Sequence, residues 1–558
     1  MKGTPAGRGL SLYRTLMTAA AAAFAGAILV QVLRYGVDVP FWDQWNFVRA
    51  LRLLSAGEQT WAQLLFASQG EHQIGMQVLL SAAAWRLSGM HMPALMVWNW
   101  AMAALFCVLA MAVTRKALGA ASSIPWTALG AAAFFIFNPA AYQVWIWGLP
   151  LVHLLIPLLY LAGIRVVQGR APDGVKIVAA AAAAMLASHI LASGLLLWAL
   201  FPLMLRPYLQ PGALRRERIA AGIATALLAA SVAPFVLGSF TSQAPANGPT
   251  GPAVLAGFFL AYTGNLVSLA TDTLPVIWSG LAGAGLVAFF AITGVLAWRE
   301  FRGKPQWAAL AIWMSLGGYS LAAGALATLG RHRFGAAYAV EASRYVLASS
   351  FLPVACVVIG AMLVAALAAG LPRRLHLYSW ALCGTVALVL ACITFRVLQT
   401  TRAAVIMRDF HVSEVRGKVA VAAANLFPVP EYRGIYATDN YLDFRLSCNY
   451  LNRRGWLRPP LWGEPFVRGL AAPDRPEEPA FGQVAEISAT GAGLRLAGWA
   501  RQADAVIVAG GPRILGILFP AADGRWSGDT GASGLREEIR CFAYRAATGE
   551  LHLLARTP

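Results

Sequence analysis

Long apolar runs recur from the N-terminus to about residue 397 and limit the possible folds of this chain. A helix needs about 20 mainly apolar residues to cross the hydrocarbon core of a bilayer. Charged residues make up only 12% of the chain, about half of the roughly 25% that is usual in soluble domains. We therefore expect an all-α polytopic membrane protein with about eleven transmembrane helices, at 13–33, 92–113, 125–146, 149–165, 177–190, 192–206, 219–238, 275–298, 306–329, 346–369 and 377–397.

The net charge of +19 does not indicate a nucleic-acid partner, because the Lys and Arg lie mainly in short clusters between the apolar runs. Such clusters orient membrane helices, with the basic loops facing the cytoplasm. If the N-terminus is cytoplasmic, the inner loops hold seventeen Lys and Arg and the short outer loops hold seven, namely Arg34, Arg49, Arg52, Arg86, Arg331, Arg333 and Arg344. The sequence therefore predicts a multi-pass protein with its N-terminus in the cytoplasm and an uncleaved first helix.

Three regions differ in composition. We expect a transmembrane domain over 1–397, an outer connector of helices and loops over 398–475, and a β-rich module over 476–558. Runs such as GLRLAGWA and ADAVIVAG in the last region alternate in the manner of short strands, which predicts a small β-sandwich. Cys448 and Cys541 are the two cysteines outside the apolar runs, and the sequence leaves open whether they pair. The inner loops contain no phosphate-binding GxxxxGK[ST] motif, so we expect any chemistry on the outer face.

The first outer loop begins with DVPFWDQW, at 38–45. Trp42 and Trp45 suit a membrane interface, where such rings concentrate, and can also position an acceptor. Asp43, an acid between aromatic rings, is a candidate general base. The segment 46–88 is amphipathic, and we expect it to form interfacial helices that bring Glu71 and His72 near Asp43.

Two later outer segments carry further candidates. RHRFGAAYAVEASRY, at 331–345, places Arg331, Arg344 and Tyr345 together, and guanidinium groups match the geometry of phosphate. Ordinary phospholipid headgroups and a particular lipid phosphate both fit this pattern. NPAAYQVWIWG, at 138–148, supplies three aromatic rings for sugar stacking or for an aromatic belt, and both interpretations stay open: Tyr142, Trp145 and Trp147.

FWDQW, EHQI at 71–74 and RHRFGAAYAVEASRY, on a chain with many crossings, together resemble the GT-C superfamily of polyprenyl-phosphate-dependent glycosyltransferases. They are similar in particular to a group of uncharacterised bacterial multi-pass proteins placed near those enzymes. The resemblance covers about residues 1–400. It implies transfer of a sugar from a polyprenyl phosphate to a cell-envelope glycan, lipid or protein on the outer face of the bacterial inner membrane, with inversion.

Carried onto this chain, the resemblance makes Asp43 the base that deprotonates the acceptor. Arg331 and Arg344 would hold the departing lipid phosphate, and Glu71 and His72 would position the acceptor or assist a cation. Many relatives carry paired acids where this chain has Asp38 and Asp43 five residues apart. A divalent cation therefore stays an open question, and no other cofactor is expected.

Three alternatives remain: a transporter or flippase of lipid-linked glycans, a polymerase or ligase of such glycans, and a non-catalytic glycan-binding scaffold. A transporter usually carries ionisable residues at mid-membrane and two related halves, and neither is evident here. The sequence does not identify the sugar, the acceptor, the polyprenol, the role of the β-rich module or the oligomeric state.

Overall fold

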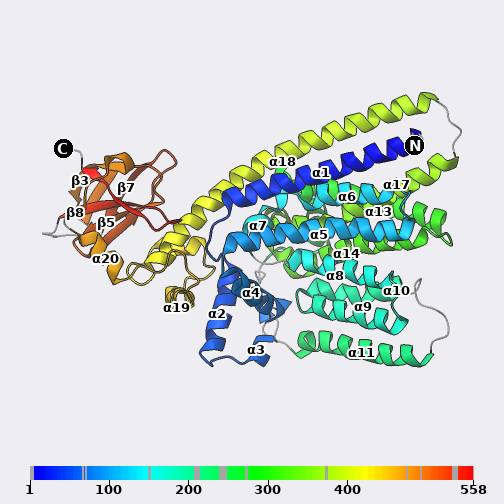
Figure 1. Cartoon of the computed structure of the whole chain (residues 1–558), viewed down its shortest axis with the longest axis horizontal. Helices are drawn as coiled ribbons and strands as arrows, with labels where there is room; N and C mark the ends of the chain where they lie inside the picture. Colours follow the sequence, from blue (N-terminus) through cyan, green and yellow to red (C-terminus); the bar gives the residue numbers. More distant parts are fainter. Residues whose placement is uncertain are drawn as a thin grey trace. The chain divides into compact units, whose positions relative to one another are not determined.

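The computed structural model describes residues 5–65, 68–69, 72–73, 75–148, 152–205, 214–237, 248–270, 274–370, 375–472, 475–490, 493–530 and 538–556. This part of the chain is mostly helical, with a small β region near the C-terminus (Figure 1). It divides into two compact units. Unit 1 comprises Met1–Arg34, Thr60–Leu80 and Met96–Met407, and unit 2 comprises Tyr35–Gln59, Ser81–Leu95 and Arg408–Pro558. The sequence-based boundaries at 397 and 475 stay predictions.

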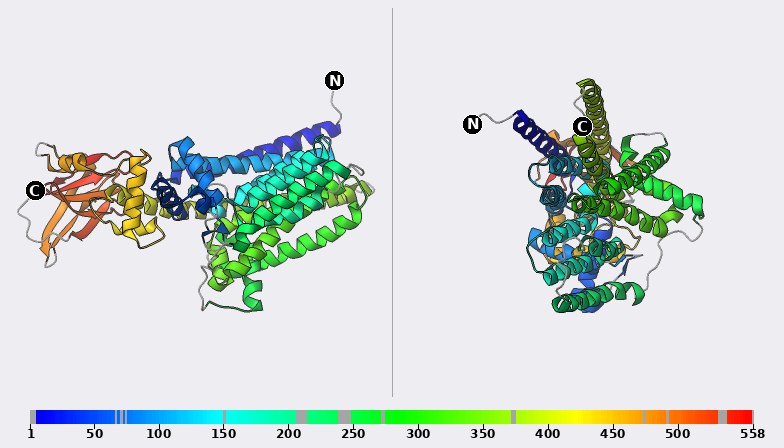
Figure 2. Two further views of the ribbon diagram at one scale, coloured as in Figure 1. Left: turned by 90° about the horizontal axis from the view of Figure 1, so that it is seen from below. Right: turned by 90° about the vertical axis from the view of Figure 1, so that its right-hand side faces the viewer.

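The apolar helices indicate a membrane protein. Five segments of the described residues are long and apolar enough to cross a bilayer, namely Leu10–Tyr35, Met92–Leu118, Pro275–Phe301, Trp307–Phe334 and Arg344–Ala368. They lie in α1 (Pro5–Tyr35), α5 (Met92–Leu118), α13 (Pro275–Phe301), α14 (Trp307–Arg331) with η5 (His332–Phe334), and α16 (Arg344–Ser349) with α17 (Phe351–Gly370). In unit 1, α13, α14 and α17 pack against one another, and Figure 2 shows the helices of this unit side by side.

The predicted eleven spans are not reached among the described residues. A sixth span is obtained if α6 (Ile124–Ile136) is joined to η1 (Pro139–Ala141) and α7 (Tyr142–Ile146), across a bend of 48°. Pro139 favours this break, because proline has no backbone N–H to continue a helix. Several other apolar helices are only 10–17 residues long. These lie in α8 (Val152–Val167), η2 (Ala192–Leu196) with α10 (Leu197–Leu205), α11 (Leu214–Leu237) and α12 (Pro252–Thr263).

The two remaining runs that were predicted to span the membrane, at 177–190 and 377–397, lie in two further helices. The run at 177–190 lies largely in α9 (Asp173–Ser188), whose first turn carries an ion pair between Asp173 and Lys176. The run at 377–397 lies in α18 (Leu375–Ala423), which contributes residues to both units.

Close backbone contact holds α12 against α13. A Cβ atom added at Gly264 would lie 2.0 Å from the carbonyl oxygen of Ser279, and one added at Gly283 would lie 2.0 Å from that of Leu260. Such distances leave room only for hydrogen, so glycine is required at both positions. Small residues of this kind allow neighbouring membrane helices to approach closely. The contact fixes α12 near the later helices that carry the 331–345 segment.

The start of the predicted first outer loop belongs to unit 2, where α2 (Asp43–Ser55) packs on α19 (Tyr441–Arg453). Trp45 is fully buried, with its ring centroid 5.7 Å from that of Tyr436 and 5.2 Å from that of Phe444. Aromatic pairs of this kind contribute about 0.5–1.5 kcal/mol each beyond area burial. Protein contacts thus cover the apolar face of α2, which the sequence had suggested would face the membrane interface.

An ionic cluster holds the other side of α2. Asp443 of α19 lies 2.6 Å from the guanidinium of Arg52 and 3.6 Å from that of Arg49. The hydroxyl of Tyr436 donates a hydrogen bond to the same carboxylate. The side chains of Arg52 and Asp443 are each only 14% exposed, so little water screens the pair. Arg49 and Arg52, which the sequence analysis assigned to an outer loop, therefore attach α2 to α19.

The β region contains two four-stranded sheets. One has the order β10-β3-β4-β7 and the other β6-β5-β8-β9. The strands are β3 (Gly482–Thr490), β4 (Gly493–Ala500), β5 (Ala505–Gly510), β6 (Arg513–Leu518), β7 (Arg525–Thr530), β8 (Ile539–Tyr544), β9 (Leu551–Leu553) and β10 (Ala555–Arg556). One buried cluster combines Leu496 and Trp526 of the first sheet with Val506 and Val508 of the second. The alternating runs of the sequence therefore form strands with a common core.

Helix α20 (Glu464–Ala471) lies against β5. Trp462, just before it, stacks on Phe466 with ring centroids 4.4 Å apart and meets Tyr544 of β8 edge-on at 5.0 Å. Cys448 and Cys541 are both buried and free, so they do not form a disulfide with each other. Burial raises the pKa of Cys541 to about 12 and also raises the pKa of Cys448. Both thiols are therefore protonated core residues.

Candidate functional sites

In unit 1, the structure brings together the segments 138–148 and 331–345, which the sequence singled out separately. The hydroxyl oxygen of Ser343 accepts a hydrogen bond from the backbone N–H of Gln143 at 3.0 Å. The side-chain oxygen of Gln143 in turn accepts from the backbone N–H and from Nη1 of Arg344, both at 3.4 Å. Gly335, with φ of 83°, permits the turn between η5 and α15 (Ala336–Glu341) that returns the chain toward this network.

Arg344 is held by uncharged partners. Its Nη2 donates to the hydroxyl of Tyr338 at 2.8 Å, and its guanidinium carbon lies 5.3 Å from the ring centroid of Tyr345. Hydrogen bonds and cation–π contacts orient a guanidinium without neutralising it. Arg344 therefore keeps a positive charge that an anion can still neutralise.

A cavity of about 410 Å³ lies next to this network. Its volume falls in the range of roughly 300–1,000 Å³ that is usual for small-molecule sites. Most of its wall is apolar, with a few polar groups, and it is lined by His153, Leu191, Ala192, Ser193, Tyr262, Tyr319, Ala323, Leu326, Ala327, Leu329, Gly330, Arg331, Tyr345 and Ala348. Two of the three predicted phosphate-binding residues, Arg331 and Tyr345, thus share one cavity.

The polar side chains that line this cavity are held in place by contacts with neighbouring side chains. Ser193 and Tyr319 lie with their hydroxyl oxygens 3.3 Å apart, and the rings of Tyr262 and Tyr345 lie 5.2 Å apart. The guanidinium of Arg331 lies 5.9 Å from the ring centroid of Phe334. Such a cavity suits a ligand that is mainly apolar and carries one anionic or hydroxyl-bearing end.

The predicted sugar-stacking residues differ in exposure. Tyr142 is half-buried, while Trp145 is fully buried and Trp147 nearly so. The ring of Trp145 stacks on Phe137, with centroids 5.8 Å apart, and its indole N–H donates to the carbonyl of Asn138 at 2.9 Å. These contacts make Trp145 a core residue, so Tyr142 is the member of the three with a more accessible ring.

Three of the residues predicted in the first outer loop lie in unit 2, namely Trp42, Asp43 and Trp45. Trp42, which is 48% exposed, has an unusual φ of 48° and donates its backbone N–H to the carbonyl of Ile435 at 2.7 Å. Asp43 is the first residue of α2 and is half-buried. A carboxylate at this position interacts favourably with the positive end of the helix dipole. Trp45 is a core residue of the contact between α2 and α19, so it is not exposed to an acceptor.

The remaining predicted pair is only partly described. Glu71 lies outside the described residues, and His72 is described only through its backbone, which forms β2 (His72–Gln73) opposite β1 (Ser68–Gln69). Their proposed roles stay predictions. Within the described ranges, no three His, Cys, Asp or Glu side chains gather in a way that could hold a metal ion.

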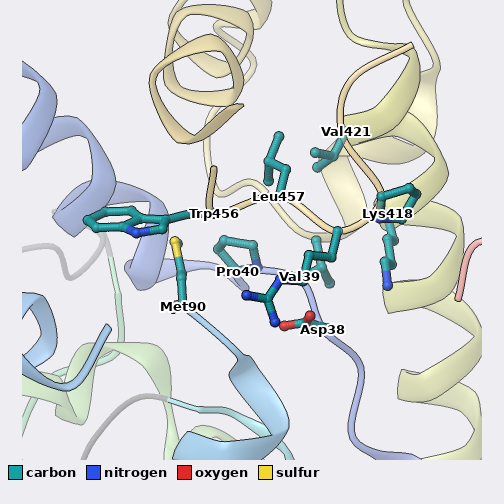
Figure 3. A pocket seen from close by; sticks show the side chains of 10 residues that line it. Asp38, Val39, Pro40, Met90, Lys418, Val421, Trp456 and Leu457 are labelled. Atoms are coloured by element: carbon teal, nitrogen blue, oxygen red, sulfur yellow. The ribbon is translucent and has the colours of Figure 1, made fainter. Parts of the chain in front are cut away.

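A second, much smaller pocket lies in unit 2 and contains the other acid of DVPFWDQW, Asp38 (Figure 3). Its space is about 10 Å³, enough for one water-sized group. The lining comes from four separate parts of the sequence: Asp38, Val39, Pro40, Met90, Lys418, Val421, Trp456, Leu457, Arg458 and Pro459. The sequence analysis assigned no role to Lys418 or Arg458. The one visible signal was a lysine at the start of the apolar run KVAVAAA.

No protein-family model, curated protein or solved structure matches this chain. The interpretation of the two sites therefore rests on their own geometry and chemistry.

Proposed function

We propose that this chain is a membrane glycosyltransferase of the GT-C type. It would take a sugar from a polyprenyl-phosphate donor and transfer it, with inversion, to a cell-envelope glycan, lipid or protein. The proposal includes eleven crossings of a bacterial inner membrane, a cytoplasmic N-terminus and a periplasmic β-sandwich. The observation that supports it best is the cavity of unit 1, where walls of Leu and Ala adjoin Arg331 and Tyr345.

The physical argument concerns the donor. A polyprenyl chain is apolar and enters from the bilayer, while its phosphate needs a cation at the membrane surface. An apolar cavity in membrane helices with a guanidinium in its wall provides both surroundings in one place. A cation beside the phosphate also stabilises the negative charge that develops as the sugar leaves. Asp43 is the proposed base for the acceptor hydroxyl, because removal of that proton strengthens the nucleophile.

A transfer assay tests the proposal. Membranes that contain the full chain are given a radiolabelled polyprenyl-phosphate sugar and fractionated envelope acceptors, and label is followed from lipid to acceptor. Asp43→Asn should lower the transfer rate by about 10²–10⁴-fold, the usual contribution of a general base. Arg331→Gln should lower it by about 10-fold or more, since a hydrogen bond to a charged group is worth about 1.5–3 kcal/mol.

Asp439→Asn is the matched control, because this carboxylate is exposed and paired with the exposed Arg433. It should leave transfer unchanged. Retention of all label on the lipid with every acceptor, or an Asp43→Asn variant as active as the native chain, contradicts the proposal.

A further inference from the structure

The small pocket of unit 2 contains a buried lysine without a direct partner. Lys418 is only 9% exposed, and it forms no hydrogen bond or ion pair with the described residues. Burial lowers the pKa of the amine, and the carboxylates of Asp38 and Asp504 partly oppose this shift from a distance. A buried charge is unfavourable unless it is paired. The pocket therefore holds a cation that lacks a counter-ion in direct contact.

The surroundings of Lys418 add a second cation. Arg458 also lines the pocket, and its Nη2 lies 3.1 Å from the position that a Cβ atom would take at Gly89. Gly89 has a φ of 62°, which favours glycine. The absence of a side chain at Gly89 thus leaves room for the guanidinium of Arg458. The next residue, Met90, has a φ of 59°, and a strained backbone is often found at functional sites.

The acid in the pocket wall already has a partner. Oδ1 of Asp38 accepts a hydrogen bond at 2.8 Å from the backbone N–H of Met92, the first residue of α5. Two cations and one carboxylate give the lining a net charge of +1. The opening has space for one atom-sized group, which matches a single oxygen of an oxyanion.

We propose that Lys418 and Arg458 bind a phosphate group in this pocket. An oxygen of the phosphate enters beside the Lys418 amine and supplies the missing counter-ion, and Arg458 contacts the group from the exposed side. The remainder of the lining is apolar, including Pro40, Trp456 and Leu457. A phosphate ester whose organic part covers this rim therefore binds more tightly than the inorganic ion. This site does not depend on the sugar transfer proposed above.

The test uses the full chain in a phosphate-free detergent. Inorganic phosphate is titrated into the protein while chloride keeps the ionic strength constant, and binding is followed by ³¹P line broadening. A separate lipid series compares phosphatidylglycerol with diacylglycerol. Lys418→Met should weaken phosphate binding by about 10-fold or more. Arg458→Gln should weaken it by several-fold, since this group is exposed. Lys304→Met, which removes an exposed lysine paired with Glu300, is the control and should have no effect.

The lipid series identifies the source of the phosphate. Tighter binding of phosphatidylglycerol than of inorganic phosphate, with loss in Lys418→Met, supports a lipid headgroup as the ligand. Binding of inorganic phosphate alone supports a soluble phosphate. Equal affinity of Lys418→Met and the native chain for both probes overturns the proposal.

A stability measurement separates binding from a structural role. Without phosphate, Lys418→Met should unfold at a higher temperature than the native chain, because it replaces an unpaired buried ammonium with an apolar group of similar length. Added phosphate should raise the unfolding temperature of the native chain only. A lower unfolding temperature for Lys418→Met in the absence of phosphate identifies Lys418 as a structural residue and overturns the proposal.

Discussion

The two units place cationic side chains in different surroundings. In unit 1, Arg331 belongs to the wall of a cavity of about 410 Å³ that is mostly apolar. In unit 2, Lys418 and Arg458 line a space of about 10 Å³ beside the carboxylate of Asp38. A large apolar cavity selects ligands by the surface that they bury, whereas a narrow charged pocket selects them by charge. If both proposals are correct, the chain recognises a long lipid in unit 1 mainly through buried apolar surface and a small oxyanion in unit 2 mainly through charge.

Filling the apolar cavity should have the largest effect. Ala327 of α14 lines the cavity, and Ala327→Trp would occupy part of the space that a polyprenyl chain needs. We expect the affinity for polyprenyl phosphate, measured by native mass spectrometry, to fall by about 100-fold. This loss equals the free energy of burying only a few methylene groups, at about 0.8 kcal/mol each. Ala325→Trp is the control, because Ala325 is exposed on the same helix. Undiminished lipid binding by Ala327→Trp would show that the cavity is not the lipid site.

Breaking the ionic cluster of unit 2 should have the next largest effect. Asp443→Asn removes the charge that pairs with Arg52 and leaves a guanidinium that is 14% exposed without its counter-ion. We expect a loss of about 2–3 kcal/mol of stability, seen as faster hydrogen exchange in α2 and α19. Binding of polyprenyl phosphate in the cavity of unit 1 should not change. Asp439→Asn removes an exposed pair and should leave stability almost unchanged. An equal effect of both variants would mean that burial of the cluster is unimportant.

A buried acid in unit 2 should make stability depend on pH, and we expect this effect to be smaller than the two effects above. Glu414 is 1% exposed, and one of its oxygens has no hydrogen-bond partner among the described residues. Burial raises the pKa of this carboxyl well above its ordinary value. Above the ordinary pKa of about 4.3, the unfolded chain releases this proton while the folded chain keeps it. Stability is therefore complete below that pH and declines as the pH rises toward the pKa of the folded state.

Glu414→Gln tests this dependence, because glutamine cannot ionise. Between about pH 5 and pH 8, the unfolding temperature of the variant should decline less than that of the native chain. The matched control is Glu464→Gln, whose carboxylate is exposed and paired with Arg468. Parallel pH profiles of native chain and Glu414→Gln would contradict the assignment.

The grouping of residues around the cavity of unit 1 was easier to predict from the sequence than the grouping around the pocket of unit 2. Arg331 and Tyr345 are close in the chain and occur where an apolar run ends, so local pattern was sufficient to group them. The burial of individual side chains could not be predicted from local sequence pattern. The aromatic residues of NPAAYQVWIWG fit both a core and a surface, and only the packing on Phe137 shows that Trp145 is in the core.

Contacts between distant segments could not be predicted. Asp38 and Lys418 line the same pocket of unit 2 although 380 residues separate them, and no local pattern indicates which face of α18 is buried. The membrane character followed directly from composition, but the number of spans did not. Helices such as α12 are apolar and yet too short to meet the length criterion.

Phosphate recognition in unit 1 is tested most directly with two lipids that differ only in their terminal phosphate. Polyprenyl phosphate and the corresponding polyprenol are allowed to compete for the purified full chain, and the bound fraction of each is measured. If Arg331 holds a phosphate at the wall of an apolar cavity, the native chain prefers polyprenyl phosphate by about 10-fold or more, and Arg331→Gln binds both lipids alike. Equal binding of the two lipids by the native chain would contradict phosphate recognition by Arg331.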